Sequence, residues 1–132
     1  MNQTALNVLI VDDCPEDRAV MRQLLEDSPY EFVCAEAESG RAAFRAYRQQ
    51  HPDCVLLDYH LPDCDAREWL TDLAGIEAYP CPVVVVTGVT SSLHSSHVLE
   101  LGAQDFIGKS WLNTESLPRT VNNAICLLYT SP

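Results

Sequence analysis

The sequence predicts a doubly wound α/β domain, with a five-stranded parallel sheet and five crossover helices. Short apolar runs rich in β-branched residues recur along the 132 residues, and helical patterns separate them. The runs are apolar at nearly every position, which is typical of strands covered on both faces, as in a parallel sheet. The length suffices for one hydrophobic core, so we expect a single domain over residues 1–132.

Five runs are the expected strands. They are Val8 to Val11, Phe32 to Ala35, Val55 to Leu57, Val83 to Val86, and Phe106 to Ile107. Parallel neighbours need a crossover connection, which is usually a helix.

Helical spacing of apolar residues predicts these crossover helices. Their apolar faces consist of Val20, Met21, Leu24 and Leu25 in the first helix, Ala43, Phe44 and Tyr47 in the second, Leu93, Val98 and Leu101 in the fourth, and Leu117, Val121, Ala124, Ile125 and Leu128 in the fifth. The third helix, near Ala66 to Leu73, is expected mainly from the order of the elements.

Start and stop signals flank several of these helices. Pro15 suits the first turn of the first helix, and Ser39 can cap the second. Gly102 can end the helix before the last strand, and Asn113 or Thr114 precedes the fifth helix.

Charge and hydropathy exclude some partners. The formal net charge of −11 argues against binding to a nucleic-acid backbone, which requires clustered Lys and Arg. The first residues lack a basic segment followed by a long apolar one, and the apolar stretch around Val83 to Val86 is far too short to span a membrane. We expect a cytoplasmic protein without direct contact to nucleic acid or membrane.

The six cysteines are scattered singly, without a C-x-x-C pair. They are Cys14, Cys34, Cys54, Cys64, Cys81 and Cys126. This spacing favours reduced, mostly buried thiols over a disulfide framework.

Polar residues follow four of the five expected strands. Asp12 and Asp13 end the first strand, Asp58 the third, Thr87 the fourth and Lys109 the fifth. Ligands of doubly wound folds bind at this carboxyl edge. Three carboxylates in one pocket need a cation, and Lys109 supplies a single positive charge. Because all ligands are oxygens, we expect Mg²⁺ or a similar hard ion such as Mn²⁺.

Four motifs carry a resemblance to a known family. They are VDD at Val11 to Asp13, LLDYHLPD at Leu56 to Asp63, VTG at Val86 to Gly88, and GAQDFIGKS at Gly102 to Ser110. In this order and spacing the chain resembles the receiver domains of bacterial two-component response regulators, including chemotaxis regulators. The resemblance implies a flavodoxin-like fold with strand order 2-1-3-4-5.

The resemblance also implies the roles of the acidic residues. Asp58 would accept a phosphoryl group from a histidine kinase or a phosphotransfer protein. Asp13, Asp58 and the backbone carbonyl of His60 would bind Mg²⁺, and Asp12 would act through metal-bound water. The domain would then be a phosphoprotein that labels itself from a phosphodonor and slowly loses the phosphoryl group, without being a turnover enzyme.

The resemblance implies that the other motif residues bind the phosphoryl group or respond to it. Thr87 would hydrogen-bond one phosphoryl oxygen, Lys109 would pair with another, and Phe106 would swing inward on activation. From its position alone, Phe106 is better explained as a core residue. The signal would leave by the face of the fourth helix, fifth strand and fifth helix, toward an output domain or protein or a second copy of the chain.

Three positions set this chain apart within the resemblance. Ser110 stands where the family usually has proline, so the tertiary amide that supports a cis peptide after Lys109 is absent and the local geometry is left open. Gly88 stands where alanine is common. His60 lies two residues after the acceptor, and its imidazole is expected to accelerate hydrolysis modestly.

Two other functions remain open. A pseudo-receiver would keep the fold without phosphorylation, although the three acids, Thr87 and Lys109 are all present. A small acyl-phosphate hydrolase could use Asp58 as nucleophile, although the short loops offer no cap insertion. The end CLLYTSP lacks a charged tail, so we expect a module excised from, or truncated relative to, a longer signalling protein.

Overall fold

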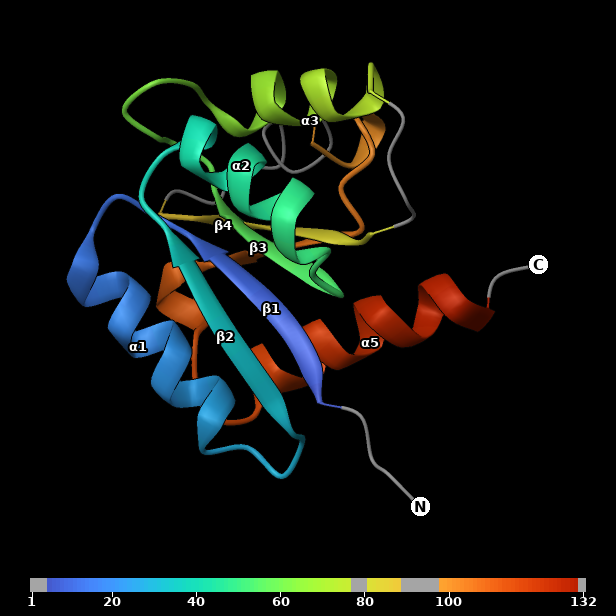
Figure 1. Cartoon of the computed structure of the whole chain (residues 1–132). Coiled ribbons are helices and arrows are strands. Elements are labelled where there is room, and N and C mark those ends of the chain that lie inside the picture. Colours follow the sequence, from blue (N-terminus) through green and yellow to red (C-terminus); the bar gives the residue numbers. More distant parts are fainter. Residues whose placement is uncertain (1–4, 77–80, 89–97, 131–132) are drawn as a thin grey trace.

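The computed structural model describes residues 5–76, 81–88 and 98–130. A parallel sheet with strand order β2-β1-β3-β4-β5 forms its centre (Figure 1). The strands are β1 (Leu6–Val11), β2 (Phe32–Ala37), β3 (Cys54–Asp58), β4 (Val83–Thr87) and β5 (Asp105–Gly108). The expected fold class and strand order are confirmed. Strand β2 runs two residues further than expected because Glu36 and Ala37 still pair with Ile10 and Val11 of β1.

Helices cover both faces of the sheet. They are α1 (Pro15–Glu26), α2 (Gly40–Gln50), α3 (Ala66–Ala74) and α5 (Ser116–Thr130), and a 3₁₀ turn spans Lys109–Trp111. Helices α2 and α3 lie on one face, and α1 and α5 on the other (Figure 1). Of the expected fourth helix, residues 98–100 are helical, and Leu93 lies outside the described residues.

Alternation along β1 divides the core between these faces. Val8 and Ile10 pack toward α1 and α5, whereas Leu9 and Val11 pack toward α2 and α3. All four are at most 1% exposed, which explains why the run is apolar throughout. The expected apolar face of α1 is wrong at Val20, which is 50% exposed, because Met21 and Leu25 occupy the side of the helix that faces the sheet.

Side-chain caps begin the helices close to the expected positions. Ser39 Oγ accepts a hydrogen bond from the Ala42 amide. Asn113 Oδ1 accepts from the amide of Ser116, the first residue of α5. At α3, Asp65 and Glu68 form a reciprocal capping box. This D-x-x-E signal locates the start of the third helix without reference to the order of the elements.

The six cysteines, all within the described residues, form no disulfide, and most are not buried. Cys34 and Cys54 lie in the core, whereas Cys126 is exposed and the other three are partly exposed. Cys14, Cys64 and Cys81 lie outside regular strands and helices, where neighbours cover only part of each side chain. The expectation of mostly buried thiols is therefore wrong.

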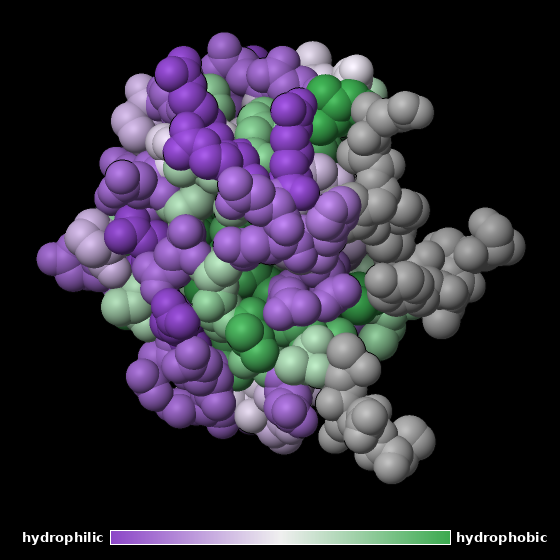
Figure 2. Space-filling view, viewed as in Figure 1, coloured by the Kyte–Doolittle hydropathy of each residue, from purple (hydrophilic) through white to green (hydrophobic). Residues whose placement is uncertain are grey.

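Polar side chains cover most of the face drawn in Figure 2, and apolar residues show in the gaps between them. Among the described helices, none has both the length and the apolar character needed to cross a bilayer.

Candidate functional site

Three carboxylates meet at the carboxyl edge of the sheet. Asp12 follows β1 directly, Asp13 comes next, and Asp58 is the last residue of β3. Because β1 and β3 are neighbours with Val11 paired to Leu57, their ends lie side by side. One oxygen from each of the three side chains lies within 4.8 Å of the other two. Asp12 is fully buried and Asp58 is 7% exposed, whereas Asp13 is exposed.

The buried Asp12 side chain is only partly satisfied. Its Oδ1 accepts a hydrogen bond of 2.9 Å from the Cys14 amide. Its Oδ2 lies 3.0 Å from Lys109 Nζ as an ion-pair partner, and no second group among the described residues satisfies it. A buried carboxylate oxygen with spare capacity, beside two more carboxylates, fits a hard divalent cation such as Mg²⁺.

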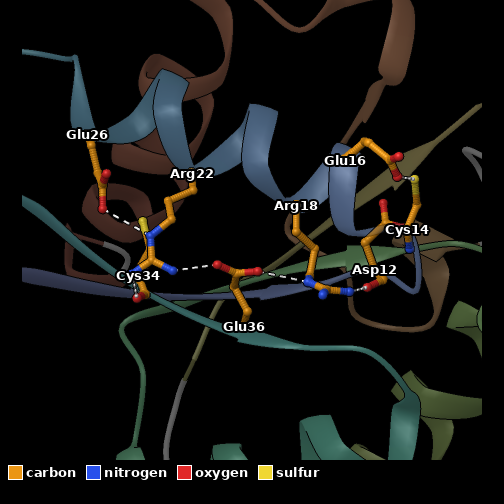
Figure 3. A network of polar contacts seen from close by, with 8 residues as sticks. All are labelled: Asp12, Cys14, Glu16, Arg18, Arg22, Glu26, Cys34 and Glu36. Carbon is orange, nitrogen blue, oxygen red and sulfur yellow. Dashed lines mark hydrogen bonds and ion pairs between the residues drawn. The ribbon is translucent and has the colours of Figure 1, made fainter.

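A network of ion pairs joins α1 to β2 and reaches the Asp12 backbone (Figure 3). Arg18 Nη1 donates to the Asp12 backbone carbonyl at 2.7 Å, and Arg18 Nε pairs with Glu36 at 2.8 Å. Arg22 bonds the same Glu36 and also pairs with Glu26. Hydrogen bonds from Arg18, together with those from Arg22, lower the pKa of Glu36 despite its partial burial. The network links the strand end to the first turns of α1.

Lys109 brings the counter-charge from the end of β5. Its Nζ lies 3.0 Å from Asp12 Oδ2 and 3.7 Å from Asp58 Oδ1. It lies closer still, at 2.7 Å, to Asp17 Oδ2 in the first turn of α1. The sequence analysis missed Asp17. Its position one helical turn after Asp13, on a helix that starts at the same sheet edge, is the signal that could have found it.

The close charges shift the protonation of the site. Burial, followed by the charge of Asp12, raises the pKa of Asp58 to about 7, although Lys109 opposes the shift. Burial alone would lower the pKa of Lys109, but its bonds to Asp17 and Asp12 raise it above the ordinary value. One ammonium therefore balances only part of the negative charge, which leaves the site suited to a further cation.

Thr87 reaches the same edge as the last residue of β4. It is 5% exposed, and its neighbour Val86 pairs with Asp58 in the sheet register. An added Cβ at Gly88 would meet nothing within 4 Å, so an alanine would also fit here. The structure thus brings Thr87 to the strand end next to Asp58.

The loop after β3 carries His60 and also contacts the start of α2. His60 is exposed and bridges to Asp65, and its ring meets that of Tyr59 edge-on at 4.8 Å. Asp63 accepts hydrogen bonds from the Gly40 and Arg41 amides at 2.8 and 3.0 Å. The loop after β3 therefore also caps the start of α2, a contact that the sequence analysis missed.

Phe106 is partly buried on β5 and packs against the core on the α2 and α3 side. It also lines a hollow of about 350 Å³ with Ile107, Gly108, Trp111 and Ser116. This position fits both a core residue and a ring that changes place, so its switching role stays a prediction. Among the described residues there is no cis peptide bond, and the Lys109–Ser110 bond is trans.

The chain is similar in sequence to a known domain family and to several larger proteins. A family model described as the response regulator receiver domain matches residues 8–122. The chain is 36% identical over 113 residues to a protein-glutamate methylesterase/protein-glutamine glutaminase of Thiobacillus denitrificans, covering 84% of this chain and 31% of that protein. A protein of the same name from Cereibacter sphaeroides is 38% identical over 104 residues, covering 77% and 28%. The chain thus spans about a third of the length of these relatives.

Solved structures agree on the fold. The chemotaxis response regulator CheY4 of Vibrio cholerae superposes with a TM-score of 0.78 at 25% identity, covering 92% of this chain and 99% of that chain. A CheY-like response regulator receiver domain protein from Methanospirillum hungatei gives a TM-score of 0.81 at 24% identity, covering 98% and 100%.

Proposed function

Because the chain belongs to the family of response regulator receiver domains, we propose that Asp58 accepts a phosphoryl group from a histidine kinase or a phosphotransfer protein. The observation that carries this proposal is the buried Asp58 carboxylate, which shares the sheet edge with two further carboxylates and lies 3.7 Å from the Lys109 ammonium. Nucleophile, counter-charge and metal ligands are the parts that phosphoryl transfer requires.

The chemistry is a single displacement. An Asp58 oxygen bonds to phosphorus while the bond from phosphorus to the donor histidine nitrogen breaks, and the nitrogen keeps that electron pair. Lys109 stabilises charge on the transferred oxygens, and Thr87 donates a hydrogen bond to one of them. Burial and the charge of Asp12 raise the pKa of Asp58 to about 7; this pKa must fall for the carboxylate to act as nucleophile, and a bound cation would favour that ionised form.

The residues present fit Mg²⁺ as the cofactor, with Mn²⁺ as a substitute. Asp13, Asp58 and the backbone carbonyl of His60 would hold the ion, with Asp12 completing the acidic set. When bound, the ion neutralises charge on the transferred oxygens. Support comes from the oxygen-only donor set and from the buried Asp12 Oδ2, whose partner among the described residues is the Lys109 ion pair.

Signal output is assigned to Thr87, Phe106 and the neighbouring surface. A phosphoryl group on Asp58 adds charge and acceptor oxygens, which draw the Thr87 hydroxyl inward, and the Phe106 ring follows. The face around β5 and α5 would then bind an output domain, an output protein or a second copy of the chain. The curated relatives carry a methylesterase name, but this chain matches only their receiver part, which fits a signalling domain rather than a turnover enzyme.

Acetyl phosphate with Mg²⁺ provides the test. Intact-mass spectrometry is expected to show one added phosphoryl group, and Asp58→Asn, nearly isosteric, is expected to show none. Absence of labelling would identify a pseudo-receiver, and many turnovers of donor per protein would identify a hydrolase. If the Asn variant still takes the phosphoryl group, the acceptor is a residue other than Asp58.

His60 is proposed to accelerate loss of the phosphoryl group, because its exposed imidazole lies two residues from Asp58 and can serve as a base near neutral pH. His60→Met is expected to dephosphorylate more slowly at neutral pH. Equal or faster loss in the Met variant would contradict this role.

A further inference from the structure

Lys109 is held by a carboxylate outside the strand-end cluster. Asp17 is the third residue of α1, and its Oδ2 accepts a hydrogen bond of 2.7 Å from Lys109 Nζ. The same Nζ lies 3.0 Å from Asp12 and 3.7 Å from Asp58. The ammonium is therefore nearest to Asp17 and farthest from Asp58, the acceptor in the proposed function.

This arrangement matters because Lys109 has few donors to share. An ammonium has three N–H groups, and the two shortest contacts direct it toward Asp17 and Asp12. A phosphoryl donor at Asp58 needs the same cation. The Asp17 side chain is 42% exposed and that of Lys109 is 27% exposed, so the Asp17 carboxylate meets the solvent beside Lys109, where it also repels an approaching anion.

We propose that Asp17 is a positioning residue that holds Lys109 away from Asp58 and so lowers the affinity of the site for anionic phosphodonors. This inference rests on the proposed function. Without the Asp17 carboxylate, Lys109 is free to turn toward the donor phosphate, and the site has one negative charge fewer. Both effects favour donor binding. Because the contact is partly exposed and exposed charge pairs are weak, the gain is about two- to fivefold in rate at low donor concentration.

The reaction to follow is labelling by a small donor. With acetyl phosphate, an Asp58 oxygen bonds to phosphorus as the bond from phosphorus to the acetate oxygen breaks, and acetate leaves with the electron pair. Phosphoramidate reacts in the same way with ammonia as the leaving group, and it carries less negative charge. A comparison of the two donors therefore reports on the charge near the acceptor.

The experiment measures the second-order rate constant for labelling of the whole chain with Mg²⁺, by intact mass. Asp17→Asn is expected to react about two- to fivefold faster with acetyl phosphate, with a smaller gain for phosphoramidate and for both donors at high salt. Asp17→Glu, which keeps the charge, is expected to restore the slow rate. Glu16→Gln is the matched control, because it removes the same charge from the neighbouring exposed position without touching Lys109.

The outcomes separate the two proposals. If Asp58 is labelled but Asp17→Asn reacts at the same or a slower rate, or if Glu16→Gln gains as much, the role of Asp17 is overturned and the proposed function stands. If neither the unmodified protein nor Asp17→Asn takes a phosphoryl group, the proposed function fails and the inference fails with it. Thermal melts verify that each variant is folded, with a small loss expected for Asp17→Asn at the helix start.

Discussion

Asp58 has a carboxyl group that resists ionisation in the folded protein. Burial and the charge of Asp12 raise its pKa to about 7, whereas an unperturbed aspartate titrates near pH 4. The folded chain thus keeps a proton on Asp58 that the unfolded chain has lost. The stability linked to this proton is fully present below about pH 4 and is lost as pH rises through about 7.

Asp58→Asn is therefore expected to stabilise the metal-free protein at pH 8, because the amide is neutral at every pH. We expect a gain of about 1–3 kcal/mol in the free energy of unfolding, shrinking toward pH 5, where folded Asp58 is already protonated. Urea unfolding in EDTA at both pH values measures the gain. An equal gain at the two pH values would show that the substitution acts through packing and not through ionisation.

The start of α2 depends on the loop that follows β3. Asp63 accepts hydrogen bonds from the Gly40 and Arg41 amides, and the Trp69 indole of α3 donates to the Gly40 carbonyl at 3.1 Å. An added Cβ at Gly40 would lie 2.4 Å from Cys64 Sγ. Elements separated in sequence therefore meet at this helix end, close to the end of β3.

Asp63→Asn is expected to weaken this helix end. The amide from Gly40 and the partial positive charge of the helix N-terminus both favour a carboxylate, and the first of these is the largest cause of the lowered Asp63 pKa. Because the side chain is exposed, the loss is modest, about 0.5–1 kcal/mol. It is present above pH 4 and fades as pH falls through the lowered pKa. Urea melts across this range check it, with Asp72→Asn on exposed α3 surface as the control expected to change little.

Gly40→Ala is expected to destabilise the fold by about 1–2 kcal/mol, since the new methyl group overlaps Cys64 Sγ in a packed site. Cys64→Ala removes that sulfur, so Gly40→Ala is expected to cost less in the Cys64→Ala background. A double-mutant cycle from denaturant unfolding measures the coupling. Equal costs in both backgrounds would locate the strain in other contacts, such as the Trp69 ring.

Charge dominates the molecule as a whole. The chain has 19 acidic residues against 8 Lys and Arg, and three of the acids gather within 4.8 Å at one sheet edge. The face drawn in Figure 2 is mostly hydrophilic, and salt screens charges on such a surface. The buried cluster is screened less, so a bound cation is expected to act on the folded state more than on the unfolded chain.

Millimolar MgCl₂ is therefore expected to raise the melting temperature. At a tenfold excess over the dissociation constant, the free energy of unfolding rises by about 1.4 kcal/mol. NaCl at equal ionic strength is the essential control, because a chain of net charge −11 gains stability from any salt. Asp13→Ala is expected to remove the difference between the two salts. Equal melting temperatures in MgCl₂ and NaCl for the unmodified protein would contradict the metal site.

The strands, their order along the chain and the convergence of Asp12, Asp58 and Thr87 on one sheet edge could be predicted from the sequence. Apolar periodicity is local, and parallel strands end at a common edge, so residues that follow strands converge without any knowledge of packing. The same logic placed Lys109 near the acids. The family motifs supplied the strand order, which periodicity alone does not specify.

The preferred partner of Lys109 could not be predicted from the sequence and emerges from the fold. Its contact with Asp17 joins residues 92 positions apart, and it depends on how α1 sits against the end of β5. The Asp63 cap on α2 and the exposure of Val20 have the same origin. Local patterns specify which side chains reach an edge or a face, whereas the rotation of each helix and the reach of flexible side chains are set by packing against elements distant in sequence.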